Sequence, residues 1–186
     1  MKRLFAAIKI HPDNTFLDTY REIKHALGYE KIKWVEENNI HITLKFFGET
    51  EEKQIPEISR VLQETGSITK GFSFFLKGLG VFGSSYEPRV IWAGIEPYRE
   101  LAETMKKLQE GFREIGYDHD RQNLVPHLTL GRIKFLKDKL VFRKVVDDFR
   151  NISSGEIRVD SFILFESLLK REGPEYLPLK KFMLLT

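Results

Sequence analysis

Two histidine–threonine pairs have residue types and spacing that could carry out acid–base chemistry. His41 and Thr43 belong to one His-x-Thr-Leu motif, and His127 and Thr129 belong to a second. If each motif lies on a β-strand, its histidine and threonine point to the same face, because side chains alternate along a strand. The leucine that ends each motif then points to the core. Each motif therefore offers an imidazole beside a hydroxyl.

A pair of imidazoles suits displacement at phosphorus, in which the nucleophile enters opposite the leaving oxygen. One neutral imidazole can accept a proton from water while a protonated one donates a proton to the leaving oxygen. Both forms are available because imidazole titrates near neutrality. The hydroxyls of Thr43 and Thr129 can donate hydrogen bonds to the non-bridging oxygens, and no metal is required. The alternative is that both histidines are hydrogen-bonded core residues.

The two motifs lie 86 residues apart, and the same offset places the strand candidate 5–9 over 91–95. We therefore expect a duplicated α+β unit with repeat halves at about 1–83 and 84–186, forming one bilobal domain over 1–186. Two similar lobes could bring their motif strands together across a pseudo-twofold axis.

Hydrophobic periodicity predicts the elements that must position these strands. Apolar residues at helical spacing predict four helices, at 13–27, 51–64, 98–115 and 140–149. Extended segments are predicted at 4–10, 32–35, 40–47, 71–76, 90–95, 125–135, 158–169 and 180–185. The Gly- and Ser-rich stretch 78–88 is predicted to be the connector between the lobes.

Composition excludes several classes of protein. The 186 residues include no cysteine, which rules out disulfides, thiol catalysis and every zinc site that uses cysteine. The apolar run 4–8 is too short for a signal peptide, and no run approaches the length of a membrane span. We therefore expect a cytoplasmic protein. The net charge of +3 permits an anionic ligand but is too small for a protein that coats duplex nucleic acid.

Three other patterns carry less weight. Residues 78–83 match G-x-G-x-x-G, but a proline and a strand follow where a dinucleotide site needs a helix. Residues 70–77 partly match an RNA-recognition signature, so a non-catalytic RNA-binding module using Phe72 and Phe74 is an alternative function. Alternation along the strand instead predicts that both phenylalanines lie in the core. The segment 118–120 contains metal-capable side chains but is expected to be a solvated loop.

The sequence resembles the two-histidine (2H) phosphoesterase superfamily, in the branch of RNA 2′,3′-cyclic phosphodiesterases that are also called LigT-like proteins or 2′-5′ RNA ligases. The residues that carry the resemblance span almost the whole chain in the family's order. They are the segments 3–8, 34–35, 39–49, 88–94 and 126–132, which include both His-x-Thr motifs.

The resemblance implies a two-lobed α+β fold with antiparallel sheets facing across a cleft and helices on the outside. It implies hydrolysis of a terminal 2′,3′-cyclic phosphate on RNA to a 2′-phosphomonoester, with His41 as proton donor to O3′ and His127 as the base that activates water. It implies no cofactor, no metal and no membrane partner. The expected partners are RNA ends with a 2′,3′-cyclic phosphate or a 2′-phosphate, tRNA fragments being one candidate source, and the protein is expected to be a monomer. Related members also run the reverse 2′-5′ joining of RNA ends.

By the same resemblance Arg132 would help to bind phosphate or nucleotide. Strict alternation places Arg132 on the face opposite His127, so this role needs a bulge or twist in the strand; otherwise the residue is structural. Phe46, at the equivalent place in the first motif, is predicted to be core. A further alternative keeps the chemistry and changes the substrate to a small cyclic nucleotide or a 2′-5′ oligonucleotide.

Overall fold

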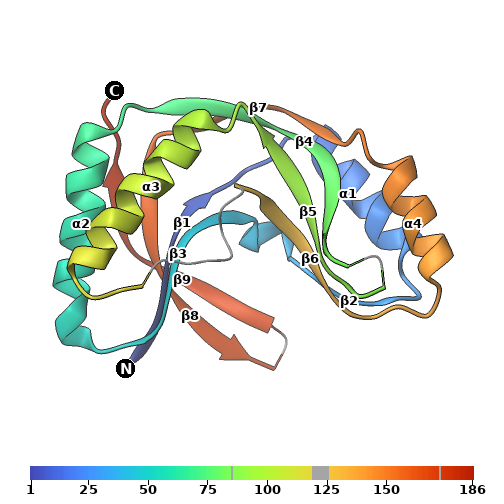
Figure 1. The fold of residues 1–186 in the computed structure, drawn as a ribbon, viewed down its shortest axis with the longest axis horizontal. Helices are drawn as coiled ribbons and strands as arrows, with labels where there is room; N and C mark the ends of the chain where they lie inside the picture. Colours follow the sequence, from blue (N-terminus) through green and yellow to red (C-terminus); the bar gives the residue numbers. More distant parts are fainter. Residues whose placement is uncertain (85, 119–125, 172) are drawn as a thin grey trace.

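The computed structural model of the protein describes residues 1–84, 86–118, 126–171 and 173–186. In these residues the chain forms two antiparallel sheets flanked by helices (Figure 1). The predicted α+β class, with antiparallel sheets and outer helices, is therefore confirmed.

The strands fall into two groups. Sheet A contains β1 (Lys2–Lys9), β3 (His41–Thr50), β8 (Ser161–Lys170) and β9 (Gly173–Met183), in the order β3-β1-β8-β9. Sheet B contains β2 (Lys31–Trp34), β4 (Phe72–Gly83), β5 (Pro88–Glu96), β6 (Leu128–Phe135) and β7 (Ser153–Val159), in the order β2-β6-β5-β4-β7. The first motif opens β3, and the second begins at the residue before β6.

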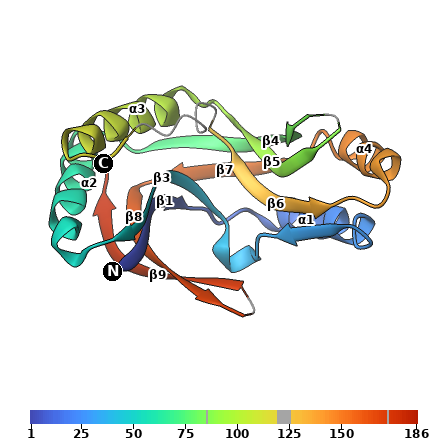
Figure 2. The same ribbon diagram turned by 60° about the horizontal axis from the view of Figure 1, so that its bottom comes forward.

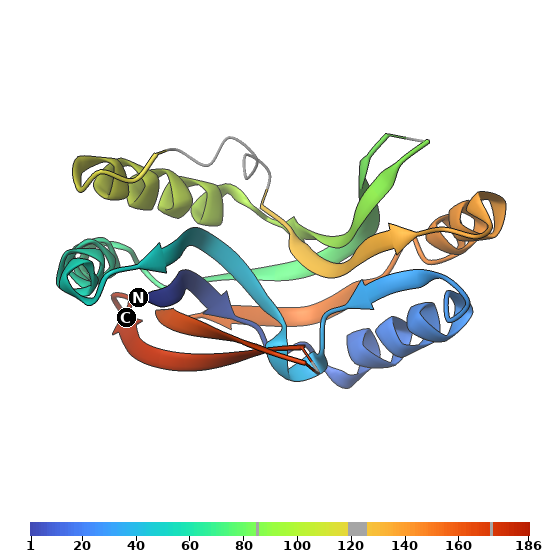
Figure 3. The same ribbon diagram turned by 90° about the horizontal axis from the view of Figure 1, so that it is seen from below.

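The helices lie in pairs at the two ends of the molecule (Figures 1 and 3). One pair, α2 (Ile55–Ile68) and α3 (Arg99–Glu114), packs together beside sheet A, and the other, α1 (Asn14–Ala26) and α4 (Lys139–Asp148), lies beside sheet B. The short turns η1 (Glu37–Asn39) and η2 (Glu52–Gln54) precede β3 and α2. None of the helices built from the described residues is long and apolar enough to cross a membrane.

Each sheet combines strands from both halves of the sequence. Strand β4, from the first half, pairs with β5 and β7, while β8 and β9, from the second half, extend the sheet that contains β1 and β3. Helix α1 likewise packs on sheet B, where the Tyr20 hydroxyl lies 2.8 Å from both Val35 O and Leu130 O, so its single hydrogen is shared between the two carbonyl oxygens. The segments 1–83 and 84–186 are therefore interleaved in space. The duplication itself stays a prediction.

Two segments differ from the predicted elements. Residues 78–83, expected to belong to a connector, continue strand β4, and β5 begins at Pro88. The last strand, expected at 180–185, is β9 and begins already at Gly173. Its first part contains Pro174, Glu175 and Pro178 and lies at the edge of sheet A. Proline and charge are typical of edge strands, and they conceal the alternating pattern of a buried one.

Of the two proposed RNA-stacking phenylalanines, one belongs to the core and the other packs against it. Phe74 is fully buried, and Phe72 packs against the same core cluster. Phe75, which points to the other face of β4, is 44% exposed. The core prediction is confirmed for Phe74, and the alternative of an RNA-binding module loses the platform on which it rested.

Replacing Phe74 by alanine is expected to lower the free energy of unfolding by about 3–5 kcal/mol, because it leaves a cavity in the core. The matched change Phe75→Ala, on the neighbouring residue of the same strand, should cost less than about 1 kcal/mol, because that ring is partly solvated. Urea denaturation followed by circular dichroism measures both. Equal effects of the two substitutions would contradict the assignment of the faces.

Candidate active site

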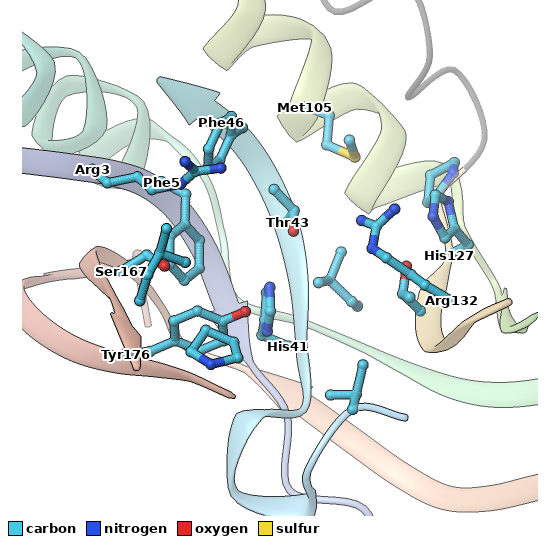
Figure 4. A pocket seen from close by; sticks show the side chains of 16 residues that line it. Arg3, Phe5, His41, Thr43, Phe46, Met105, His127, Arg132, Ser167 and Tyr176 are labelled. Carbon is cyan, nitrogen blue, oxygen red and sulfur yellow. The ribbon is translucent and has the colours of Figure 1, made fainter. Parts of the chain in front are cut away.

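The five residues singled out in the sequence line one cavity. His41, Thr43, His127, Thr129 and Arg132 all border a pocket of about 720 Å³. The first two come from sheet A and the others from sheet B or the residue before it. Figure 4 shows His41 and Thr43 on one side of the pocket, with His127 and Arg132 across from them. The fold thus brings together two motifs that are far apart in the sequence.

A β-bulge follows the threonine in both motifs. In sheet A, Ala7 pairs with Thr43 and Ala6 with Lys45, so Leu44 is the extra residue. In sheet B, Trp92 pairs with Thr129 and Ile91 with Gly131, so Leu130 is the extra residue. A bulge shifts the alternation of side chains by one position. The two bulges occupy equivalent places, 86 residues apart, and give both motifs the same order of buried and exposed residues.

The bulges turn Phe46 and Arg132 toward the pocket. Arg132 lines the pocket although strict alternation would place it on the opposite face from His127. Phe46 is 44% exposed and also lines the pocket, so the prediction that it is a core residue is wrong. The physical reason is the same at both positions: two consecutive residues are buried after the threonine, and the next one faces the cavity.

His41 is held by its backbone neighbourhood and by aromatic rings. Its Nδ1 donates a hydrogen bond to the carbonyl oxygen of Asn39 at 2.6 Å, because a carbonyl can only accept. Nε2 is then the nitrogen left for chemistry. The ring lies 5.1 Å from that of Phe5 and meets the Tyr176 ring edge-on at 5.2 Å, centroid to centroid. These contacts fix the orientation of the imidazole.

The same surroundings favour the neutral form of His41. Burial lowers the pKa of its imidazole, and the positive charges of Lys9 and Arg132 lower it further, while the hydrogen bond to Asn39 acts in the opposite direction. In the unliganded protein, His41 therefore binds its second proton less readily than a histidine in water.

His127 has a different set of neighbours. Its ring meets the Phe82 ring edge-on at 4.7 Å and lies 6.4 Å from that of Trp92. Phe82 and Trp92 stack on each other at 5.0 Å. Gly80 lies directly against the Trp92 ring, where a Cβ atom would collide with the indole. A glycine of the discarded G-x-G-x-x-G pattern thus makes room for the aromatic support of His127.

The pocket has positive charge on both sides. Arg132 lies at the sheet B side, and the Arg3 guanidinium lies at the sheet A side, 5.0 Å from the centre of the Phe46 ring. Both arginines act to lower the pKa of Tyr176, although burial raises it overall. Positive potential around a cavity lined by hydroxyls and imidazoles suits an anionic group such as phosphate.

Arg3, Phe5 and Tyr176 also line the pocket, and none of them was given a role at the site by the sequence analysis. Arg3 and Phe5 lie on the same face of β1, so the alternation of that strand could have revealed them. Tyr176 lies on the edge strand β9, whose prolines and irregular burial pattern gave no strand signal in this part of the sequence. Among the described residues no group of three or more His, Asp or Glu side chains could hold a metal ion. Of the segment 118–120, His119 and Asp120 lie outside the described residues.

Comparison with known proteins identifies relatives across most of the chain. A family model described as LigT like Phosphoesterase matches residues 8–92 and 95–176. An RNA 2′,3′-cyclic phosphodiesterase of Thermotoga maritima is 36% identical over 143 residues, which cover 77% of this chain and 74% of the relative. A protein of the same name from Methanocaldococcus jannaschii is 33% identical over 179 residues, covering 96% of this chain and 99% of the relative.

Solved structures share the fold. A crystal structure of a Thermus thermophilus protein superposes with a TM-score of 0.78 at 26% identity, covering 98% of this chain and 97% of that one. E. coli LigT, crystallised with 3′-AMP, gives a TM-score of 0.72 at 24% identity, covering 100% and 99%. The resemblance seen in the motifs is thereby confirmed, and the chain belongs to the LigT-like phosphoesterase family.

Proposed function

We propose that this protein hydrolyses the terminal 2′,3′-cyclic phosphate of RNA to a 2′-phosphomonoester, without a metal ion. The observation that carries the proposal is the pair of His-x-Thr strands facing each other across one positively charged pocket. The names of the relatives from Thermotoga maritima and Methanocaldococcus jannaschii support the choice of RNA cyclic phosphate as substrate.

In the proposed reaction, water attacks phosphorus as the P–O3′ bond breaks. His127 accepts a proton from the water, and the new P–O bond forms opposite the leaving O3′. His41 donates a proton from Nε2 to O3′, which leaves as a hydroxyl. The phosphate stays on O2′, His41 ends neutral, and His127 ends protonated. Exchange of one proton each with solvent restores the starting state.

The hydrogen bond of His41 to Asn39 suits the role of proton donor. It occupies Nδ1 in both protonation states, so Nε2 is the nitrogen available to a substrate. The lowered pKa means that the free protein holds His41 mostly neutral near pH 7. A bound phosphate anion opposes the effect of Lys9 and Arg132, so substrate itself would favour the protonated, active form.

The remaining predicted residues would hold the phosphate. We assign the hydroxyls of Thr43 and Thr129 as hydrogen-bond donors to the non-bridging oxygens, one from each sheet. The exposed Arg132 guanidinium would pair with the same oxygens and balance the charge that develops on them. These contacts are made to the group that stays on the 2′ oxygen.

The same residues could serve 2′-5′ joining of RNA ends. If the 5′-hydroxyl of a second RNA occupied the position of the attacking water, the same P–O3′ bond would break and a 2′-5′ linkage would form. Small cyclic nucleotides and 2′-5′ oligonucleotides would use the same two imidazoles. Comparison of these substrates in one assay decides which of them the enzyme prefers.

Alanine at His41 or His127 should each reduce hydrolysis of a cyclic-phosphate oligonucleotide by about 10²- to 10⁴-fold, because each change removes one proton-transfer group. Chromatography of the products against 2′- and 3′-phosphate standards measures the rate and the bond that breaks. The exposed His25 provides the matched control, and His25→Ala should retain wild-type activity. Full activity of either active-site variant, loss of activity on adding a chelator, or a 3′-phosphate product would contradict the proposal.

Proton NMR of the imidazole resonances tests the state of His41. In the unliganded protein its midpoint should lie below the ordinary value of 6.5, and saturating inorganic phosphate should raise it. The resonance is assigned by its disappearance in His41→Ala. A midpoint at or above 6.5 without phosphate, or one that phosphate leaves unchanged, would contradict this account of the proton donor.

A further inference from the structure

The outer part of the β8–β9 hairpin forms one wall of the pocket. Ser167 and Leu169 from β8, with Pro174 and Tyr176 from β9, all line it. Strand β8 pairs with β1 only over residues 163–166, and beyond that point its partner is β9 alone. The hairpin accordingly projects past β1 (Figure 2). A two-stranded ribbon is marginally stable by itself, so other contacts must hold this wall in place.

One of these contacts comes from the turn that precedes the first motif. The side-chain amide of Asn39, in η1, donates a hydrogen bond to the carbonyl oxygen of Pro174 at 2.9 Å. The Lys9 ammonium donates a hydrogen bond to the carbonyl oxygen of the neighbouring Asn38, which ties the same turn to β1. The hairpin is thus attached to a turn that is itself fixed to sheet A.

The second contact is aromatic. The Tyr176 ring meets the Phe5 ring at 4.8 Å and an angle of 70°, and it meets the His41 ring at 5.2 Å and 84°. Phe5 in turn stacks on Phe165 of β8 at 5.2 Å. In Figure 4, Tyr176 lies directly beside His41. Its ring covers one side of the imidazole and so reduces the contact of that side with solvent.

Asn39 contacts both the hairpin and the imidazole. Its backbone oxygen accepts the Nδ1 hydrogen of His41, and its side chain holds the β9 residue two positions before Tyr176. A change in the side-chain contact would therefore alter the position of Tyr176 while leaving the backbone acceptor in place.

We propose that Asn39 is a positioning residue that couples the β8–β9 hairpin to His41, so that Tyr176 packs on the imidazole and holds Nε2 toward the reacting phosphate. The proposal rests on the proposed function of His41 as proton donor. Asn39 and Tyr176 act through His41: they fix its orientation and its shielding from water.

The test compares Asn39→Ala with Asn38→Ala, which changes the same residue type in the same turn. The Asn38 side chain is exposed, and its carbonyl remains in the alanine variant. Asn39→Ala should lower kcat by about 10- to 100-fold, as expected for a displaced catalytic group, with a smaller change in KM. It should also raise the NMR midpoint of His41 toward 6.5, because the imidazole becomes more solvated. Asn38→Ala should leave kcat within about twofold of wild type and should leave the His41 midpoint unchanged.

Substitutions at Tyr176 provide a second, independent measurement. Tyr176→Leu should lower kcat and raise the His41 midpoint, as expected for Asn39→Ala. Tyr176→Phe keeps the ring, so its kcat and its His41 midpoint should both stay close to the wild-type values. The proposal is overturned if Asn39→Ala changes kcat without moving the His41 midpoint, or changes neither. The midpoint is read without substrate, so this failure is distinct from failure of the proposed function, which full activity of His41→Ala would reveal.

Discussion

Alternation of side chains along a strand is the constraint on which the pocket depends. Strand β3, and strand β6 together with the residue before it, each bury aliphatic residues on one face, which leaves a histidine and a threonine on the other. The core thereby fixes the backbone that carries the chemical groups. A bulge after each threonine then changes the alternation, so that the next cavity-facing residues are Phe46 and Arg132. Regular strands would have given the pocket its imidazoles and hydroxyls without this arginine.

The two sides of the pocket have matching backbones and different surroundings. His41 donates to a backbone carbonyl and packs against Phe5 and Tyr176, whereas His127 packs against Phe82 and Trp92. Distinct environments are the usual means by which similar groups take up the roles of acid and base. We infer that the similar strands fix the positions of the two imidazoles, and that their different neighbours determine which one acts as acid and which as base.

Sequence reasoning located much of this arrangement and missed identifiable parts. The motifs, their strands and the buried stripe of α3 were readable because periodicity marks them. The bulges were not readable, since two consecutive buried residues after each threonine leave no distinct pattern in the sequence, and this is why Phe46 was predicted to be a core residue. Tyr176 was missed because it lies on the proline-containing first part of β9, an edge strand without regular alternation of buried and exposed residues. The interleaving of the halves was missed because a repeat does not reveal which copy a strand such as β4 joins.

The most direct test of the central claim is the pH dependence of kcat/KM for cyclic-phosphate RNA in three proteins. The wild type should give a bell-shaped profile, because one imidazole must be protonated and the other must not. His41→Ala should lose the decline at high pH, since that decline reports deprotonation of the proton donor. His127→Ala should lose the decline at low pH. A wild-type profile that is flat across neutral pH, or variants that keep both declines, would contradict catalysis by this pair of histidines.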